Sequence, residues 1–407
     1  MTDVIANSPN LTKKYEDFLF KFNPTLPAPA ELRVDLRPDL ARRIAARAVL
    51  EKGSQQVIFG GVGSGKTTEL WVAKRVMDEE RTRKSMFLDM SLHTNLESIK
   101  AGAILAAVGD RLCELIRSET PVKRASRIGE AIRQARVFAH GEQVWVENPE
   151  GDPEFTSDDF DDGPSGYSVH IPGKLTPTIP HLRRDVAKTA DWLPILLAEV
   201  SSEGLMITID GLDRLRNLDT FWTLVDQDLR ILRNLKVSVV IVAPLLTYFT
   251  PGRDLEDRFD KTHALWSLPK DSPALLDLLK HRDQDTLSHS AATEIVHYSG
   301  GVLRDLVSLA RDAGEEAYLR GSEQIEQSHA HYAVQQLGLS YRRGLGPVQL
   351  TDLLEIYNGG GFDVRNVQHR ELLATRRLIE YSPDEFEIHP ALTRELAWPD
   401  QPNVRSR

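Results

Sequence analysis

Residues 60–68 read Gly60-Gly61-Val62-Gly63-Ser64-Gly65-Lys66-Thr67-Thr68. This spacing fits G-x-x-x-x-G-K-[ST], the pattern of a loop whose main-chain N–H groups surround the phosphates of a nucleotide. An apolar run at 57–59 precedes the loop and predicts a buried strand, and a helical stretch, 68–77, follows it. A strand, a glycine loop and a helix in this order direct amides and the positive end of a helix at an anion. The alternative is a glycine-rich turn that binds nothing.

The last residues of the loop carry the chemistry. Lys66 would reach the β- and γ-phosphates, and the Thr67 hydroxyl would coordinate Mg²⁺. The glycines are needed because the loop must wrap the phosphates in backbone conformations that a Cβ would forbid. We therefore expect residues 60–68 to bind ATP or ADP, with Mg²⁺.

The whole chain has the composition of an ordinary globular protein. It has 407 residues, 41% of them hydrophobic and 27% charged, which predicts two or three domains. No apolar run approaches the ~18 residues of a membrane helix. Cys113 is the single cysteine, which excludes an intrachain disulfide, and the N-terminus lacks a signal-peptide pattern. We expect a cytoplasmic protein that does not associate with membranes.

The net charge of −10 argues against nonspecific binding of nucleic acid by the molecule as a whole, although it leaves room for one basic face. Acidic residues gather at 147–162, which indicates a solvated insert. Strands that alternate with helices indicate a parallel α/β sheet. The predicted organisation is a leader that packs against the nucleotide core (1–50), the core (51–270) with an insertion at about 119–182, a helical lid (271–340), and a helix–helix–hairpin unit of winged-helix type (341–407).

A second strand signal ends in a carboxylate. The apolar run 205–209 predicts a central strand, and Asp210 follows it. With a phosphate loop upstream, a carboxylate at this position would hold Mg²⁺ directly or through water. The alternative role for Asp210 is to cap a turn at the end of the strand.

The run Ile209-Asp210-Gly211-Leu212-Asp213-Arg214 resembles the AAA+ and STAND branches of P-loop ATPases, which include the NB-ARC and NACHT groups. The resemblance implies an additional-strand ATPase fold in which Asp213 orients the attacking water. The alternatives for Asp213 are a salt bridge with Arg214 or a helix cap. Many AAA+ proteins have Glu directly after the magnesium-linked Asp, whereas this chain has Gly211, which implies slow hydrolysis.

Three further matches extend the resemblance through most of the chain. The motif at 299–306 resembles the lid motif with a sensor arginine, so Arg304 would contact the γ-phosphate. Arg258 precedes the predicted last core strand, where many AAA+ proteins place an arginine finger that acts on a neighbouring subunit; Arg253 is a rival. His389 takes the position of a STAND histidine that contacts ADP. The alternative for each of these arginines is an ordinary surface residue, and the alternative for His389 is a structural role. The predicted strand 237–242 departs from the AAA+ pattern because no polar residue follows it.

Two functions follow from the resemblance. The first is a slowly hydrolysing ATPase switch that forms homo-oligomers and assembles or gates a partner effector or signalling protein, as in bacterial antiviral defence. The alternative is a DNA-binding AAA+ ATPase of the initiator or transposition-regulator type, which would contact nucleic acid through basic residues near 365–377 of the winged helix. A scaffold that binds nucleotide without turnover is a third possibility.

Overall fold

The core of the protein is a parallel sheet, seen in a computed structural model that describes residues 8–24, 29–37, 39–80, 83–119, 126–140, 190–201, 204–250 and 255–396. Its strands are β1 (Gln55–Phe59), β2 (Lys84–Asp89), β3 (Leu205–Asp210), β4 (Ser238–Val242) and β5 (Lys261–Ala264). Their order is β2-β3-β4-β1-β5, and every neighbouring pair is parallel. Strand β4 lies between β1 and β3, so the predicted additional-strand α/β fold is confirmed.

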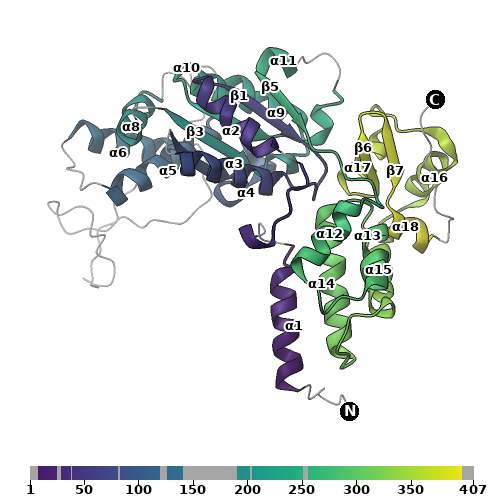
Figure 1. Cartoon of the computed structure of the whole chain (residues 1–407). Coiled ribbons are helices and arrows are strands. Elements are labelled where there is room, and N and C mark those ends of the chain that lie inside the picture. Colours follow the sequence, from purple (N-terminus) through teal and green to yellow (C-terminus); the bar gives the residue numbers. More distant parts are fainter. Residues whose placement is uncertain are drawn as a thin grey trace, which may run out of the picture.

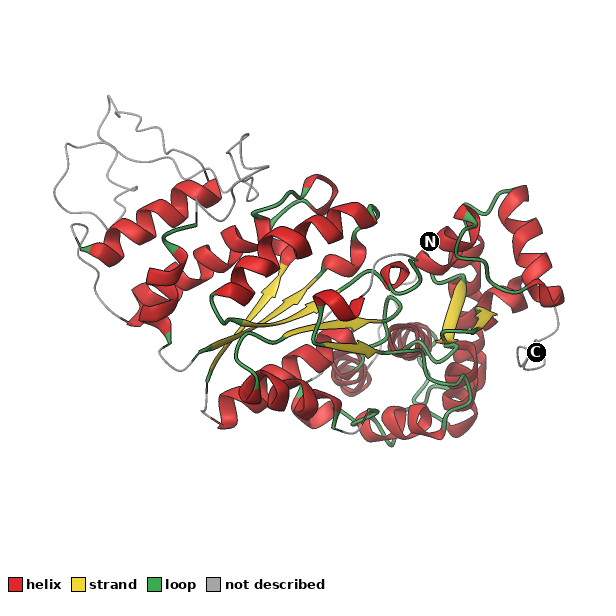
Figure 2. Cartoon of the chain, turned by 90° about the horizontal axis from the view of Figure 1, so that it is seen from above, coloured by secondary structure: helices red, strands yellow, loops and turns green. Residues whose placement is uncertain are grey.

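Helices cover both faces of this sheet, which explains why every residue of β1, β3 and β4 is buried and why most of them are apolar (Figure 2). One face packs against α2 (Leu40–Leu50) and α3 (Lys66–Glu80). The other packs against a larger set: α5 (Ala103–Glu119), α6 (Arg127–His140), α8 (Leu193–Val200), α9 (Leu218–Leu224) and α10 (Arg230–Asn234). A short helix, α4 (Met90–His93), follows β2, and another, α11 (Leu255–Arg258), precedes β5. Most of the predicted insertion, including its proposed short strands and acidic run, lies outside the described residues.

A helical unit follows the sheet, as the sequence predicted for the lid. It consists of α12 (Pro273–Arg282), α13 (His289–Tyr298), α14 (Leu303–Leu319) and α15 (Gln327–Arg342). Helix α1 (Pro9–Lys21) lies along α14, where Tyr15 and Phe18 are buried in the core of the lid (Figure 1). The leader was expected to pack against the nucleotide core. Helix α2 and Arg37 do contact the core, whereas α1 lies on the lid, because its aromatic residues require an apolar surface that α14 supplies.

The C-terminal unit contains α16 (Pro347–Glu355), α17 (Val367–Ala374), the antiparallel strands β6 (Leu378–Ser382) and β7 (Glu385–Ile388), and α18 (Pro390–Glu395). This is the predicted order of helix, helix and hairpin. Helix α18 packs on α15 of the lid, and the hairpin lies beside the lid helices (Figure 1). Within the described ranges, no helix is long and apolar enough to cross a membrane.

Candidate nucleotide-binding site

The phosphate loop connects β1 to α3, and its backbone requires glycine at two positions. Gly63 and Gly65 have φ values of 93° and 97°, a region that L side chains rarely adopt. A Cβ on Gly63 would lie 2.7 Å from Cβ of Arg304, which belongs to lid helix α14. The Arg304 N–H donates a hydrogen bond to the Gly63 carbonyl at 3.3 Å. The lid therefore rests directly on the loop.

Lys66 is held inside the loop by oxygen atoms. Its Nζ donates to the carbonyls of Gly60 and Gly61 at 2.9 and 2.7 Å and lies 3.0 Å from Oδ2 of Asp213. The residue is only 4% exposed, so this set of oxygens compensates for the removal of the ammonium from water. Asp213 thus pairs with Lys66 and not with Arg214, the partner considered as an alternative to its role toward water.

The end of β3 meets the start of α3. The Thr67 hydroxyl donates to Oδ2 of Asp210 at 2.6 Å, across 143 residues of sequence. Burial raises the pKa of Asp210 above its usual range, while the hydrogen bonds from Thr67 and from the Gly211 N–H lower it. Asp89, at the end of β2, is the register partner of Asp210 in the sheet. The sequence-predicted magnesium ligands Thr67 and Asp210 therefore lie together.

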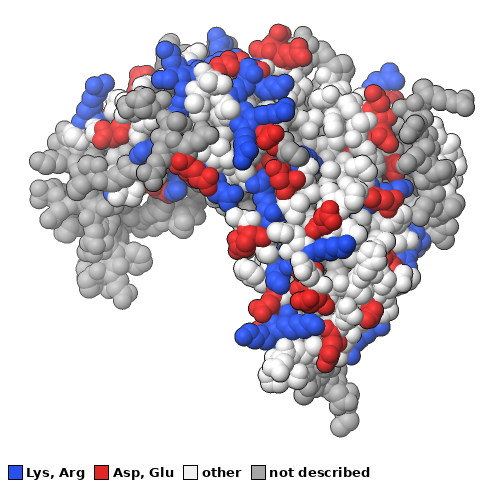
Figure 3. Space-filling view, viewed as in Figure 1, with Lys and Arg blue, Asp and Glu red and all other residues white. Residues whose placement is uncertain are grey.

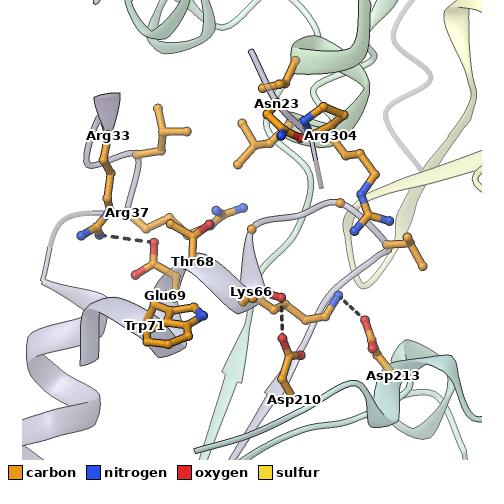
Figure 4. A pocket seen from close by; sticks show the side chains of 18 of the residues that line it. Asn23, Arg33, Arg37, Lys66, Thr68, Glu69, Trp71, Asp210, Asp213 and Arg304 are labelled. Atoms are coloured by element: carbon orange, nitrogen blue, oxygen red, sulfur yellow. Dashed lines mark hydrogen bonds and ion pairs between the residues drawn. The ribbon is translucent and has the colours of Figure 1, made fainter. Parts of the chain in front are cut away.

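A cavity of about 500 Å³ opens beside these residues, within the usual size range of small-molecule sites. Four parts of the chain line it: the leader, the phosphate loop with α3, the ends of β2 and β3, and the lid (Figure 4). The lining includes Arg33, Arg37, Arg214, Arg282 and Arg304 among its cations. A triphosphate carries the complementary charge.

The electrostatics of the arginines support an anionic ligand. Burial lowers the pKa of Arg304, and the neighbouring cations Arg376 and Arg214 lower it further. Burial also lowers the pKa of Arg37, which Glu69 only partly offsets. Burial therefore disfavours the charged form of both guanidinium groups. A bound polyanion would favour the charged form again.

The donor set suits magnesium with a nucleotide. Among the described residues, no group of three or more His, Cys, Asp and Glu side chains could hold a metal ion. Mg²⁺ needs no such cage, because it commonly takes one or two protein oxygens and completes its shell with phosphate and water. The oxygens of Thr67 and Asp210 fit that requirement.

Two predicted site residues from outside the phosphate loop do not line this cavity. Arg258, in α11, pairs with Asp226 at 2.9 Å and lies over the Trp222 ring. His389, which is 0% exposed, has its Nε2 3.3 Å from Oδ2 of Asp305. A direct contact between His389 and phosphate would therefore require another arrangement of the C-terminal unit. Arg253 lies outside the described residues.

Sequence reasoning missed two residues that hold the loop. Arg37 donates to the carbonyls of Ser64 and Trp266 at 3.0 and 2.8 Å, which ties the leader to the loop and to the segment after β5. Glu380, in β6, accepts a hydrogen bond from the Gly61 N–H at 2.8 Å. Strand β4 ends without the polar residue that the AAA+ pattern would place there, since Ala243 and Pro244 follow it.

No protein-family model and no curated protein matches the chain. Similar solved structures include the Aeropyrum pernix ORC2 protein in ADPNP–ADP complexes, which is 14% identical with a TM-score of 0.49. The match covers 93% of this chain and 98% of the ORC2 chain. The Aeropyrum pernix ORC1 protein in complex with DNA is 16% identical (TM-score 0.46; 89% and 83% covered). The Thermotoga maritima RuvB Holliday junction branch migration motor is 12% identical (TM-score 0.41; 91% and 99% covered). Likenesses this distant say nothing about what this chain binds, so the site must be interpreted from its own geometry.

Proposed function

We propose that the chain binds ATP or ADP with Mg²⁺ in this cavity and hydrolyses ATP slowly. The observation that carries the proposal is the 2.6 Å hydrogen bond between Thr67 and Asp210, which brings the phosphate loop and the strand-end carboxylate to one point. Two cavity arginines, Arg37 and Arg304, whose pKa values burial lowers, give independent support.

In this proposal each residue has a separate task. The loop amides and Lys66 bind the phosphates, and Arg304 reaches the terminal phosphate from the lid. Thr67 and Asp210 would hold Mg²⁺, which neutralises charge on the phosphates when bound. Asp213 exchanges its ion pair with Lys66 for a water that it orients toward the terminal phosphate. The absence of a polar side chain at Ala243 supports a slow rate.

Calorimetric titration with Mg·ATP tests the binding site. Lys66→Ala should abolish tight binding, because it removes the one ammonium that the loop surrounds. Lys74→Ala is the matched control, since Lys74 lies on the same helix and pairs with Asp78 at 2.5 Å toward solvent. Equal affinities for the two variants would overturn the proposed site.

Phosphate release tests hydrolysis. Asp213→Asn should retain nucleotide binding and lose phosphate release, whereas Asp210→Asn should also weaken the dependence of binding on Mg²⁺. If the wild-type chain binds Mg·ATP but releases no phosphate over many hours, the chain is a nucleotide-binding scaffold and the enzymatic part of the proposal fails.

The arrangement of the lid supports a switch that acts on a partner protein. The lid touches the loop through Arg304, and the C-terminal unit touches it through Glu380, so both sense the nucleotide directly. An effector would dock on one nucleotide state, and self-assembly would bring Arg258 of one copy to the site of another. Light scattering with ATP, with ADP and without nucleotide tests assembly. Identical masses in all three would refute it, and Arg258→Ala should lose any assembly that depends on ATP.

A second candidate is DNA binding through the C-terminal unit. It is favoured by Arg365, which precedes α17, has a side chain 85% exposed, and pairs with Asp363 at 3.1 Å on the surface. Two other arginines of the region are already engaged, because Arg376 contacts Asp305 and Arg377 donates to the carbonyl of Tyr341. In Figure 3, Lys and Arg gather over the upper part of the face, above the sheet, and are mixed with acidic residues over the lid.

Titration of a labelled duplex at increasing salt separates the candidates. DNA binding should weaken with salt, and Arg365→Ala together with Arg370→Ala should reduce the salt slope by about two. No binding at low salt would exclude the second candidate and leave the partner-protein switch.

A further inference from the structure

Glu380 presents a carboxylate from the C-terminal unit to the phosphate loop. The residue is 3% exposed, and its Oε1 accepts a hydrogen bond from the Gly61 N–H at 2.8 Å. Its backbone carbonyl accepts a hydrogen bond from the Ser267 N–H at 3.1 Å, which fixes β6 against the segment that follows β5. A buried carboxylate on a rigid strand thus uses one of the loop amides.

The loop itself is shaped for this carboxylate. Gly61, unlike Gly63 and Gly65, does not have a positive φ, so its backbone conformation is open to other residues. A Cβ on Gly61 would lie 2.3 Å from Oε1 of Glu380, and the next two nearest atoms, at 2.9 Å, belong to the same carboxylate. The obstacle to a Cβ at position 61 is therefore the Glu380 carboxylate and not the path of the chain.

The carboxylate lies within electrostatic reach of the loop's own cation. Burial raises the pKa of Glu380 above its usual range, and the Gly61 N–H and Lys66 offset this only in part. The loop presents amides and an ammonium that suit a polyphosphate. It already holds one anionic group from elsewhere in the chain, the Glu380 carboxylate. Glu380 and Gly61 do not line the cavity, but a polyphosphate on the cavity side of the loop and the carboxylate on Gly61 repel each other across the loop, more strongly where water is excluded.

We propose that Glu380 is a positioning residue that makes nucleotide binding and docking of the β6–β7 hairpin oppose each other. The inference rests on the proposed function, since it assigns the regulation of that site. A triphosphate at the loop repels the Glu380 carboxylate and loosens the hairpin, and the docked hairpin weakens nucleotide binding by the same factor. The terminal phosphate adds charge, so ATP loosens the hairpin more than ADP does.

The decisive variant is Glu380→Gln, which removes the charge and keeps an oxygen that accepts from Gly61. Its matched control is Glu387→Gln, because Glu387 is a buried carboxylate of the same hairpin that pairs with Lys270 at 3.4 Å. Calorimetry should show that Glu380→Gln binds Mg·ATP at least about fivefold more tightly than the wild type, the lower end of coupling between sites. The gain in affinity of Glu380→Gln for ADP should be smaller, and Glu387→Gln should bind both nucleotides with wild-type affinity.

Hydrogen exchange of β6 and β7 provides the second readout. Mg·ATP should accelerate exchange in the wild-type hairpin and leave it unchanged in Glu380→Gln. Gly61→Ala, which displaces the carboxylate without altering it, should abolish the acceleration as well. The inference is overturned if Glu380→Gln binds both nucleotides with wild-type affinity, or if ATP leaves wild-type exchange unchanged. A wild-type chain that binds no nucleotide would instead refute the proposed function.

Discussion

Replacing Asp305 with alanine should loosen the C-terminal unit from the lid. Asp305 follows Arg304 in α14, and its carboxylate accepts a hydrogen bond from the Tyr341 hydroxyl at 2.5 Å and from Arg376. His389 lies 3.3 Å away on the other side. These groups join the lid helices to the segments on both sides of the β6–β7 hairpin, so one carboxylate holds two units together.

The size of the effect follows from burial. Burial alone would raise the pKa of Asp305, but His389 and Arg376 more than compensate and hold the pKa below its usual value. Breaking a buried pair by removing one partner typically destabilises by about 3–5 kcal/mol. Arg376 is 25% exposed and can regain water, whereas His389 is 0% exposed and cannot. We therefore expect the lower end, about 3 kcal/mol, for Asp305→Ala.

Thermal unfolding followed by circular dichroism measures this loss. A change of that size should lower the unfolding midpoint of the lid and C-terminal unit by on the order of 10 °C. Tyr341→Phe, which removes one hydroxyl, should fall between the wild type and Asp305→Ala. Asp363→Ala is the control, because the Asp363–Arg365 pair is solvent-exposed and should contribute nothing measurable. A midpoint for Asp305→Ala equal to that of Asp363→Ala would refute the reasoning.

Three more outcomes follow from the geometry. Gly63→Ala should weaken nucleotide binding by at least about tenfold in calorimetry, because its φ of 93° is strained for alanine and its Cβ would meet Arg304. Arg37→Ala should weaken binding too, and Arg37→Lys should not restore it, since a single ammonium cannot reproduce the fork between Ser64 and Trp266. Burial raises the pKa of Asp228 to about 7, so the folded state binds a proton that the unfolded state releases near pH 4. Stability should therefore fall as pH rises from about 4 to 7. A denaturation midpoint that is flat over this range, or an equal slope in Asp228→Asn, would contradict this.

The sheet and the meeting of Thr67 with Asp210 could be predicted because they rest on local patterns. An apolar run followed by a glycine loop, and a second apolar run ending in Asp210, each specify a strand and what lies at its carboxyl end. Parallel strands bring those ends to one edge, so Thr67 and Asp210 meet although 143 residues separate them. The strand order confirms the fold that this reasoning implied.

The contacts of the C-terminal unit could not be predicted in this way. His389 was chosen by resemblance to a motif, but its side chain lies against Asp305 of α14 and Tyr341 of α15, contacts that no local pattern encodes. Glu380 was overlooked because a charged residue in a short strand usually faces solvent. Its burial depends on the docking of β6 against the loop, a contact across 319 residues.

The site is therefore assembled from segments that are distant in sequence, which has a consequence for stability. Arg37 of the leader, Arg304 of the lid and Glu380 of the C-terminal unit each contact the loop through a main-chain atom. A ligand that binds more tightly when a segment is docked stabilises that docking by mass action, and a ligand that binds less tightly weakens it. Arg37 and Arg304 bring positive charge, whereas Glu380 brings negative charge. A polyphosphate should therefore tighten the leader and the lid while it releases the hairpin, so that one chemical event moves two parts of the chain in opposite directions.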